Sequence, residues 1–195
     1  MNSKMLSDAA MNNEARTVQN AISGDRQAFT QLFDQFYEPI NRYFFFHLTQ
    51  SSDSDDLSEM VFLQAWRNIK KFDPSKGTFK AWLYRIAHNL LVDHYRRQKE
   101  KVPLDEITDL PSTMNSSEQT LIEHQQVLQL KWALLQLDER SRDVLICRYV
   151  NEMSHRETAR MLKLTEGNVR VIQMRALKKM KNFFAEDIDE QTKFE

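Results

Sequence analysis

The sequence predicts an all-α protein with two small helical domains joined by a flexible acidic linker. Three observations predict this fold class. The 195 residues include three Gly and four Pro, and 41% are hydrophobic, a composition typical of a globular helical chain. Apolar residues recur with helical spacing, and no segment alternates as a strand does. One stretch with two prolines, residues 102–116, has no sustained period and separates two periodic segments.

The first domain is expected over residues 20–101, after an N-terminal tail of residues 1–19. Within 26–49, apolar side chains at i, i+3, i+4, i+7 and i+8 predict two helices with a break near Pro39. The break is expected because proline lacks the N–H that a helix interior uses and clashes with the preceding turn.

The sequence "SSDSDD" supplies N-cap candidates and first-turn acids, so a third helix is expected from there to about Phe72. "DPSKGT" then predicts a turn. A fourth helix is expected from about Thr78 to Lys99, with an inward stripe of Trp82, Ile86 and Leu90.

The second domain is expected over residues 117–185, with an acidic tail at 186–195. Ser116 and Gln119 have the spacing of a capping box at its start. Helical periodicity predicts three or four helices, at about 117–137, 139–151, 155–162 and 166–185.

The last two of these helices fit a helix-turn-helix. Ser154 and Glu157 form a second capping box. Counted from His155, this unit needs a small fifth residue and apolar eighth, fifteenth and eighteenth residues, which are here Ala159, Leu162, Val169 and Ile172. Lys163 falls at the turn where a left-handed Gly is favoured, and a side chain there costs on the order of 1 kcal/mol.

A helix-turn-helix of this winged-helix-like class places its second helix in the major groove of DNA. Asn can pair with adenine, Arg with guanine, and Val can contact a thymine methyl group. The outward face carries Asn168, Val171, Arg175 and Lys178, with Arg170, Lys179 and Lys181 as phosphate contacts. The alternative is an αα-hairpin that only packs.

Charge is sorted along the chain although the formal net charge is −1. Acids dominate 25–59 and the segment before Arg140, whereas basic residues dominate 60–101 and 142–181. Two basic regions indicate two contacts with polyanions.

In the first basic region, aromatics interleave with polar groups along "FKAWLYRIAHNLLVDHYRRQK", as single-stranded nucleic acid requires. An amphipathic core helix with a solvated face is the alternative. The candidate contacts with a melted strand are Lys76, Lys80, Arg85, His88, Asn89 and Arg96.

Enzymatic and metal-binding classes find no support in the sequence. The five histidines lack paired ligand spacing, and "DSDD" lacks the Gly and Glu of a calcium loop, having Ser58 and Gln64 instead. The single cysteine, Cys147, lies in the apolar run "VLICRYV" and is expected to be a buried structural thiol. No metal, cofactor or membrane span is expected. The protein is expected to be cytoplasmic.

The stretch "FDPSKGTFKAWLYRIAHNLLVDHYRR" resembles the promoter-melting segment of bacterial RNA polymerase sigma factors of the extracytoplasmic-function (ECF) class, in the sigma-70 family. "GDRQAFTQLFDQFYEPI" resembles the opening helix of that family, and "DDLSEMVFLQAW" its polymerase-binding helix. "LQLDERSRDVLICRYVNEMSHRETARMLKLTEGNVRVIQMRALKKM" resembles its carboxyl-terminal helix-turn-helix domain. The resemblance covers roughly residues 20–185.

The resemblance implies a protein that binds core RNA polymerase and directs it to promoters. The helix over 53–67 would hold the clamp of the largest subunit, with Asp56, Glu59 and Arg67 as contacts. The 72–80 loop and the following helix would capture flipped bases of the minus-ten element. The second domain would read the minus-thirty-five duplex.

Family members are usually silenced by an anti-sigma protein, so such a partner is expected here. Two departures are visible: Met60 stands where the family has an acid, and Val171 and Ile172 stand where many members have Ser-Arg. The competing hypothesis is a stand-alone helix-turn-helix regulator that binds duplex DNA, as a dimer on a palindrome, without polymerase.

Overall fold

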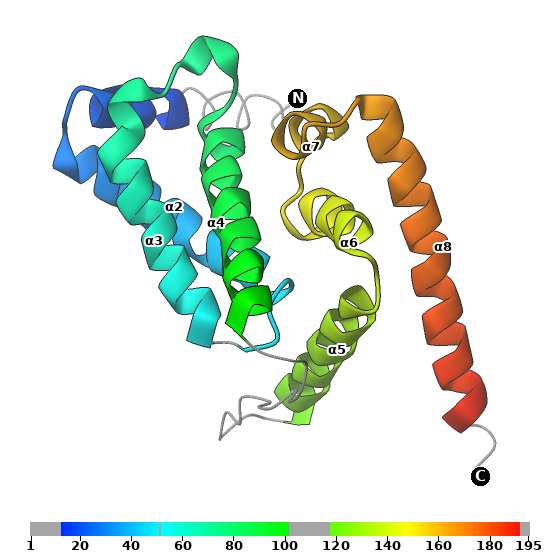
Figure 1. The fold of residues 1–195 in the computed structure, drawn as a ribbon. Helices are drawn as coiled ribbons and strands as arrows, with labels where there is room; N and C mark the ends of the chain where they lie inside the picture. Colours follow the sequence, from blue (N-terminus) through cyan, green and yellow to red (C-terminus); the bar gives the residue numbers. More distant parts are fainter. Residues whose placement is uncertain (1–12, 51, 102–117, 192–195) are drawn as a thin grey trace, which may run out of the picture. The chain divides into compact units, whose positions relative to one another are not determined.

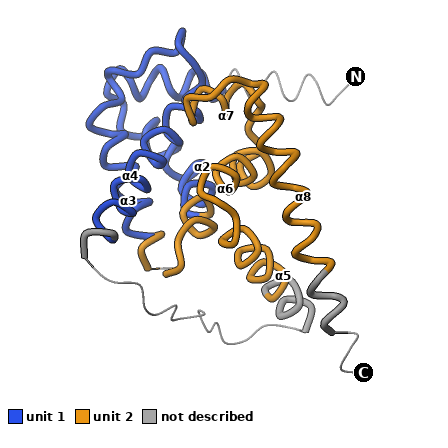
Figure 2. Tube along the Cα trace, turned by 45° about the vertical axis from the view of Figure 1, so that its right-hand side comes forward, with its two compact units in different colours: residues 1–41, 55–102 blue, residues 42–54, 103–195 orange. Residues whose placement is uncertain are grey.

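The computed structural model describes residues 13–50, 52–101 and 118–191, which are helical and contain no strand (Figure 1). This confirms the all-α prediction. The chain divides into two compact units (Figure 2): unit 1 is Met1–Asn41 with Asp55–Val102, and unit 2 is Arg42–Ser54 with Pro103–Glu195. The predicted linker and Ser116 of the first predicted capping box lie outside the described residues.

Unit 1 opens with a helix over residues 13–22, which the sequence pattern did not indicate. The chain turns at Gly24, whose φ of 97° favours glycine. Asp25 then caps the next helix, because its Oδ1 accepts from the backbone N–H of Gln27 at 2.8 Å and of Ala28 at 3.2 Å. Helix α2 spans Arg26–Phe45.

The predicted break near Pro39 is wrong, because α2 continues through it. Proline in a helix interior costs about 3 kcal/mol. Burial on both sides of Pro39 offsets this cost, since Phe36, Ile40 and Phe44 are all buried and each buried large apolar side chain contributes about 1.5–3 kcal/mol. Packing therefore overrides the local preference.

Helix α3 spans Ser52–Asn68, and a 3₁₀ turn η1 follows over Ile69–Lys71. The third helix therefore ends before the predicted Phe72. A second 3₁₀ turn, η2, covers Pro74–Lys76 at the predicted turn. Helix α4 spans Phe79–Lys101, close to the predicted fourth helix.

The core of unit 1 is built from aromatic rings. The Phe62 ring lies 4.7 Å from that of Phe33 and 6.0 Å from that of Tyr37, between centroids. Phe79 similarly contacts Phe36 at 5.6 Å and Phe72 at 5.8 Å. These contacts join α2, α3, α4 and the connection before α4 into one packed unit.

The predicted inward stripe of α4 is only partly correct. Leu90 is buried, but Trp82 and Ile86 are half-buried. The residues that turn fully inward are Phe79, Leu83, Tyr84, Ala87 and Leu91. The stripe is rotated relative to the prediction, which leaves Trp82 and Ile86 at the surface of unit 1.

Unit 2 contains α5 (Glu118–Leu135), α6 (Glu139–Leu145), α7 (His155–Leu162) and α8 (Glu166–Gln191). The helix predicted over 139–151 is present up to Val150, but its second half is a π-helical turn, η3, over Ile146–Val150. The backbone N–H of Asn151 bonds the carbonyl of Ile146 at 3.0 Å. Within this turn Ile146 and Cys147 are buried and Tyr149 is exposed.

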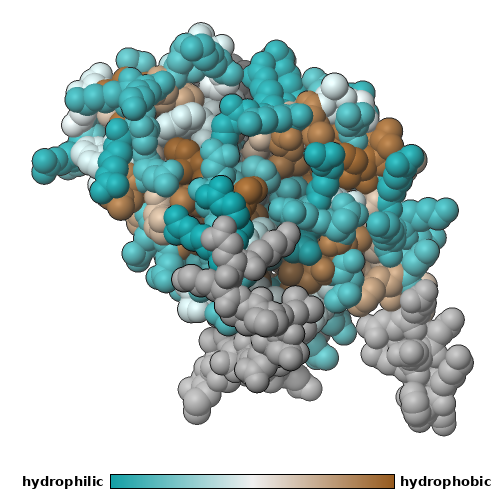
Figure 3. Space-filling model, viewed as in Figure 1, coloured by the Kyte–Doolittle hydropathy of each residue, from teal (hydrophilic) through white to brown (hydrophobic). Residues whose placement is uncertain are grey.

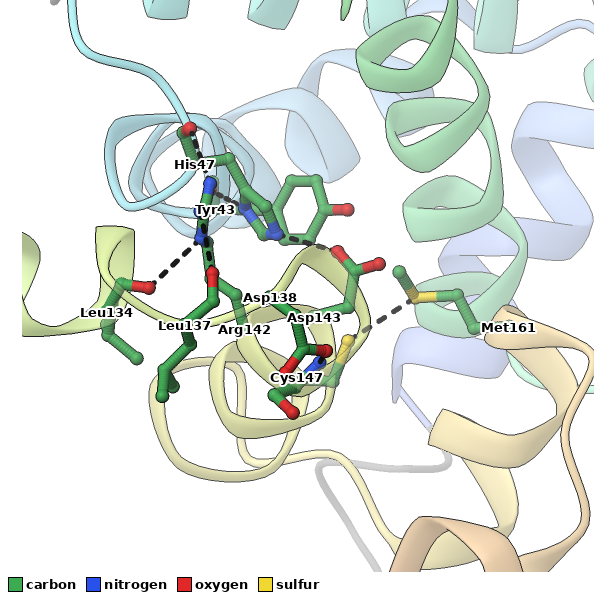
Figure 4. A network of polar contacts seen from close by, with 10 residues as sticks. Tyr43, His47, Leu134, Leu137, Asp138, Arg142, Asp143, Cys147 and Met161 are labelled. Atoms are coloured by element: carbon green, nitrogen blue, oxygen red, sulfur yellow. Dashed lines mark hydrogen bonds and ion pairs between the residues drawn. The ribbon is translucent and has the colours of Figure 1, made fainter. Parts of the chain in front are cut away.

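A buried polar contact fixes the segment Arg42–Ser54 inside unit 2 (Figure 4). His47 Nδ1 lies 2.7 Å from the carbonyl of Tyr43, and its Nε2 lies 2.8 Å from Oδ1 of Asp143, 96 residues away in sequence. A carbonyl only accepts, so Nδ1 carries a hydrogen. One further proton bridges Nε2 and Oδ1.

Arg142, beside this pair, binds backbone carbonyls (Figure 4). Its guanidinium donates to the carbonyls of Leu134, Leu135 and Leu137 at 3.0–3.1 Å and to that of His47 at 3.5 Å. Leu134 and Leu135 lie in the last turn of α5, where carbonyls lack helical partners, and Leu137 follows just after it. Arg142 therefore closes α5 and holds it against α6.

Candidate nucleic-acid interface

The turn between α7 and α8 is built as the sequence predicts. The Ser154 hydroxyl accepts from the Glu157 N–H at 3.2 Å, and the Glu157 carboxylate accepts from the Ser154 N–H at 2.9 Å, which confirms the capping box. Lys163 lies in the left-handed region with φ 55° and ψ 43°. The chain thus reverses at the predicted residue.

Apolar side chains hold the two helices together. Ala159 and Val169 are buried with Val144 of α6, and Leu162 and Ile172 pack against them. The two inward positions of α8 beyond this cluster, Ala176 and Met180, are buried as well. The predicted helix-turn-helix spacing is therefore confirmed residue by residue, and the opposite face of α8 is available for ligands.

Every predicted duplex contact is exposed. These are Asn168, Arg170, Val171, Arg175, Lys178, Lys179 and Lys181. The apolar member of this set, Val171, has 42% of its surface exposed, and the neighbouring Met174 has 65% exposed. Figure 3 shows that apolar side chains form patches on a mostly hydrophilic surface. Met174 was not predicted as a contact, yet its exposure adds it to the candidate reading face.

Two of the predicted cations have acidic partners. Arg170 lies 3.8 Å from Glu166, and Lys179 lies 3.3 Å from Asp138 at the start of α6. Partial burial acts to raise the pKa of Asp138, but hydrogen bonds from Ser141 and the pairing with Lys179 outweigh it, so the pKa is lowered. Asp138 stays ionised near neutral pH and keeps Lys179 close to the base of α8.

A polar network behind α8 was missed by the sequence analysis. The Gln173 amide lies between three side chains of η3 and α7. Its Oε1 is 3.4 Å from Arg148 Nε and 3.0 Å from His155 Nε2, and its Nε2 donates to the Tyr149 hydroxyl at 2.8 Å. No local sequence pattern indicates this network, because the partners of Gln173 lie 18 to 25 residues away from it in sequence.

On unit 1, a hollow of about 270 Å³ opens beside α4. It is lined by Asn68, Lys71, Trp82, Arg85, Ile86 and Asn89. Of the predicted melted-strand contacts, Arg85 and Asn89 line this hollow, whereas Lys76, Lys80, His88 and Arg96 do not. The sequence analysis missed Asn68 and Lys71, which come from the end of α3 and from η1.

The hollow combines an aromatic wall with donors and acceptors. The Trp82 ring packs 5.3 Å from that of Phe72 and 5.5 Å from that of Phe79, so it has a fixed orientation. Asn68 donates to the carbonyl of Gln64 at 2.9 Å and accepts from Lys71 Nζ at 3.3 Å. This chemistry suits a planar polar ring such as an unstacked base.

The turn before α4 is held by Asp73. Its Oδ1 accepts from the Ser75 hydroxyl at 2.7 Å and from the Ser75 N–H at 3.0 Å. These hydrogen bonds lower the pKa of Asp73. Lys76 lies 3.3 Å from Asp73, and farther along, Arg96 lies 3.1 Å from Asp93. Both cations are exposed, and such surface pairs are weak enough for a phosphate to replace the carboxylate.

A third surface lies on α3, where the predicted polymerase contacts Asp56, Glu59 and Arg67 are exposed. Between them lies an exposed apolar strip of Met60, Leu63 and Trp66. Beside this helix, burial raises the pKa of Tyr37, helped by the negative charges of Asp55 and Glu59. The departure Met60 extends the apolar strip and does not disturb the helix.

None of the described helices has both the length and the apolar run needed to cross a bilayer. Across the same residues, no three His, Cys, Asp or Glu side chains gather into a group that could hold a metal ion.

Two family profiles match the chain. Residues 32–101 match Sigma-70 region 2, and residues 133–182 match Sigma-70, region 4. Together they cover more than half of the chain. The first includes α3, the hollow and α4, and the second includes the helix-turn-helix.

Similar proteins include "ECF RNA polymerase sigma factor BldN" of Streptomyces coelicolor, 30% identical over 87% of this chain and 65% of its own length. "ECF RNA polymerase sigma factor SigW" of Bacillus subtilis is 27% identical over 80% of this chain and 88% of its own length. The chain thus spans slightly less than two thirds of BldN.

Among solved structures, CnrH in complex with the cytosolic domain of CnrY has a TM-score of 0.69 and 26% identity, covering 88% of this chain and 96% of that one. The sigma factor RpoE of Bartonella quintana, solved with the anti-sigma factor NepR, has a TM-score of 0.67 at 17% identity, covering 80% of this chain and 96% of that one. The second likeness concerns the fold alone.

Proposed function

The chain belongs to the sigma-70 family, in its ECF class, and from this premise we propose that it binds core RNA polymerase and directs transcription to a specific class of promoters. It recognises the minus-ten and minus-thirty-five elements and helps to melt the promoter. The observation that carries the proposal is that one chain holds both a helix-turn-helix with an exposed basic reading face and a separate aromatic hollow beside a basic helix. The first surface fits duplex DNA, and the second fits an unstacked base.

Residues 117–185 form the domain that reads the minus-thirty-five duplex. Asn168, Val171 and Arg175 lie against base edges, and Arg170, Lys178 and Lys179 contact the backbone. Their common exposure on α8 supports this assignment. A ligand phosphate would compete with Glu166 and Asp138 for the two paired cations.

Within residues 20–101, the part that belongs to unit 1 holds the melted minus-ten strand. An unstacked base enters the hollow and packs on Trp82, while Arg85 and Asn89 hydrogen-bond its edge. Lys76, Lys80, His88 and Arg96 follow the strand outside the hollow. Stacking on an aromatic ring contributes about 1–3 kcal/mol per base, which offsets part of the cost of unpairing.

The α3 surface binds the clamp of the largest polymerase subunit. Its apolar strip provides buried area, and Asp56, Glu59 and Arg67 provide the charged rim that sets orientation. The protein acts where RNA polymerase acts, in the cytoplasm, without a catalytic group, cofactor or insertion into a membrane. The structure of CnrH holds the cytosolic domain of CnrY, which supports an anti-sigma protein as a further partner.

Reconstitution with core polymerase tests the function. The chain should co-purify with core polymerase and yield promoter-dependent transcripts from a genomic template library. Failure of either result contradicts the proposal. Tight specific binding of duplex DNA by the free chain, unchanged by polymerase, would instead identify a stand-alone regulator.

Four single substitutions test the division of roles. Asn168→Ala and Arg175→Ala should each weaken recognition of the upstream duplex by about 1–3 kcal/mol. Arg85→Ala and Asn89→Ala should leave polymerase affinity unchanged and slow formation of the open complex. Loss of polymerase affinity in the second pair would contradict the assignment.

The matched controls each remove an exposed arginine elsewhere in the same unit. Arg140→Ala serves for Arg175→Ala, and Arg26→Ala serves for Arg85→Ala. Both controls should behave as the wild type in the two assays.

A further inference from the structure

The network around Gln173 has a fixed hydrogen-bond direction. Arg148 can only donate, so the amide atom that faces it is Oε1. The other amide atom, Nε2, is therefore the one that faces Tyr149, to whose oxygen it donates at 2.8 Å. His155, which also meets Oε1, accordingly carries a hydrogen on Nε2.

This direction leaves Tyr149 as a donor toward the surface. Its oxygen already accepts from Gln173, so the hydroxyl hydrogen points away from the network. The Tyr149 side chain is 55% exposed, and within the described residues its hydroxyl takes part in this one hydrogen bond. The hydroxyl hydrogen is therefore free to meet an acceptor from outside the chain.

Local structure gives Tyr149 its position. It lies in the π-helical turn Ile146–Val150, and such insertions in helices are frequent at functional sites. The turn buries Ile146 and Cys147 and leaves Tyr149 outward. The bond from Gln173 then ties the phenol to the side of α8, in the same turn as Met174 and Arg175.

A phosphate is the acceptor that fits this place. A helix with side chains is about 10–12 Å across and the major groove is about 12 Å wide, so phosphates of the two strands flank a helix that enters it. Phosphate oxygens only accept, and Tyr149 presents a donor beside the reading half of α8.

We propose that the Tyr149 hydroxyl donates a hydrogen bond to a phosphate oxygen of the upstream duplex, and that Gln173 is a positioning residue that orients it. The inference rests on the proposed reading of duplex DNA by α8. Because the donor is neutral, its contribution is independent of base sequence and nearly independent of salt.

The test uses holoenzyme assembled from the full chain and core polymerase, with binding to promoter DNA measured by titration. Tyr149→Phe removes only the hydroxyl. It should weaken promoter binding about tenfold, as expected for a hydrogen bond to a charged acceptor. The slope of affinity against salt should stay unchanged, whereas Lys178→Gln should lower that slope by about 0.9.

A scan with single methylphosphonate linkages identifies the acceptor. At one linkage in the upstream duplex, the uncharged linkage should reduce the promoter affinity of the wild type more than it reduces the affinity of Tyr149→Phe. The two proteins should then bind this modified promoter equally well. Gln173→Met should weaken binding by a similar factor, and the double variant should be no weaker than either single one. Unfolding, followed separately, should show that each variant is folded under the conditions of the titration.

Equal binding by Tyr149→Phe and the wild type overturns the inference, as does a scan in which the difference persists at every linkage. A loss of core polymerase affinity in Tyr149→Phe, with promoter affinity unchanged, assigns Tyr149 to a protein contact and also overturns it. Failure of the wild-type holoenzyme to bind any promoter is a distinct result, because it refutes the proposed function itself.

Discussion

The two units bury different chemistry. Unit 1 is held by stacked and edge-on rings from Phe33, Phe36, Phe62, Phe72 and Phe79. Unit 2 buries polar and charged groups, among them His47, Lys131, Asp143 and Thr158. Apolar packing depends little on pH or salt, whereas a buried polar group stabilises only while its partner is present. The stability of the two candidate DNA-binding surfaces should therefore differ in its dependence on pH and salt.

The largest effect is expected where unit 2 loses a buried partner. Asp143→Ala removes the carboxylate that bonds Nε2 of His47, and breaking a buried pair typically costs about 3–5 kcal/mol. Chemical denaturation followed by circular dichroism measures this loss. Asp143→Asn is the matched control, because its side-chain amide can still hydrogen-bond with Nε2 of His47 and should recover most of the stability. A loss in Asp143→Ala well below this range would mean that the contact contributes little.

An effect of similar size is expected from packing in unit 1. Phe62→Ala removes a buried ring and should cost about 3–5 kcal/mol, and Phe62→Leu should cost clearly less. The comparison predicts that the loss for Phe62→Ala is the same at low and high salt. A loss that changes strongly with salt would contradict the contrast between the units. Hydrogen exchange resolved by residue measures which unit loses protection.

A smaller, pH-dependent effect is expected at Asp138, whose Oδ1 accepts from the Ser141 N–H at 3.0 Å at the start of α6. Asp138→Ala should cost about 1 kcal/mol at pH 7. Since the folded-state pKa of Asp138 is lowered, its contribution is fully present above the unfolded value of about 3.9. This contribution is lost as the pH falls through the lowered pKa of Asp138 in the folded protein.

The stability difference between the wild type and Asp138→Ala should therefore close in acid, as measured by urea denaturation between pH 7 and pH 2. Asp138→Asn keeps an uncharged cap and should show little of this pH dependence. A constant difference at all pH values would contradict the role of the ionised carboxylate.

The smallest effect is a gain. Glu152 has a left-handed φ of 52°, which costs a residue with a side chain about 1 kcal/mol. Glu152→Gly should raise stability by about 0.5–1 kcal/mol, since the greater freedom of glycine in the unfolded chain offsets part of the relief. The melting temperature should rise by about 2–4 °C or less. Glu152→Ala keeps the Cβ and should show no gain.

Sequence spacing predicted the parts of unit 2 whose determinants are local. Ala159, Val169 and the left-handed Lys163 follow from a pattern 18 residues long, so they could be placed from the sequence. The contact of His47 with Asp143 could not be, because it joins residues 96 apart. The same holds for Gln173, whose partners come from other elements.

In unit 1, tertiary packing changed what local rules predicted. Pro39 was expected to break a helix, and burial of its neighbours kept α2 continuous. Trp82 and Ile86 were expected inside α4 but lie half-exposed at the hollow. An amphipathic pattern gives the period of a helix, but the position of its inward face depends on the neighbouring elements.

The placement of Arg42–Ser54 in unit 2 also bears on how the protein is made. Synthesis proceeds at about 5–20 residues per second, and His47 leaves the ribosome 96 residues ahead of Asp143. For roughly 5–20 seconds, this segment has no site to fold into. Its apolar residues Tyr43, Phe44, Phe46 and Leu48, all buried in the finished protein, stay accessible to chaperones during that delay.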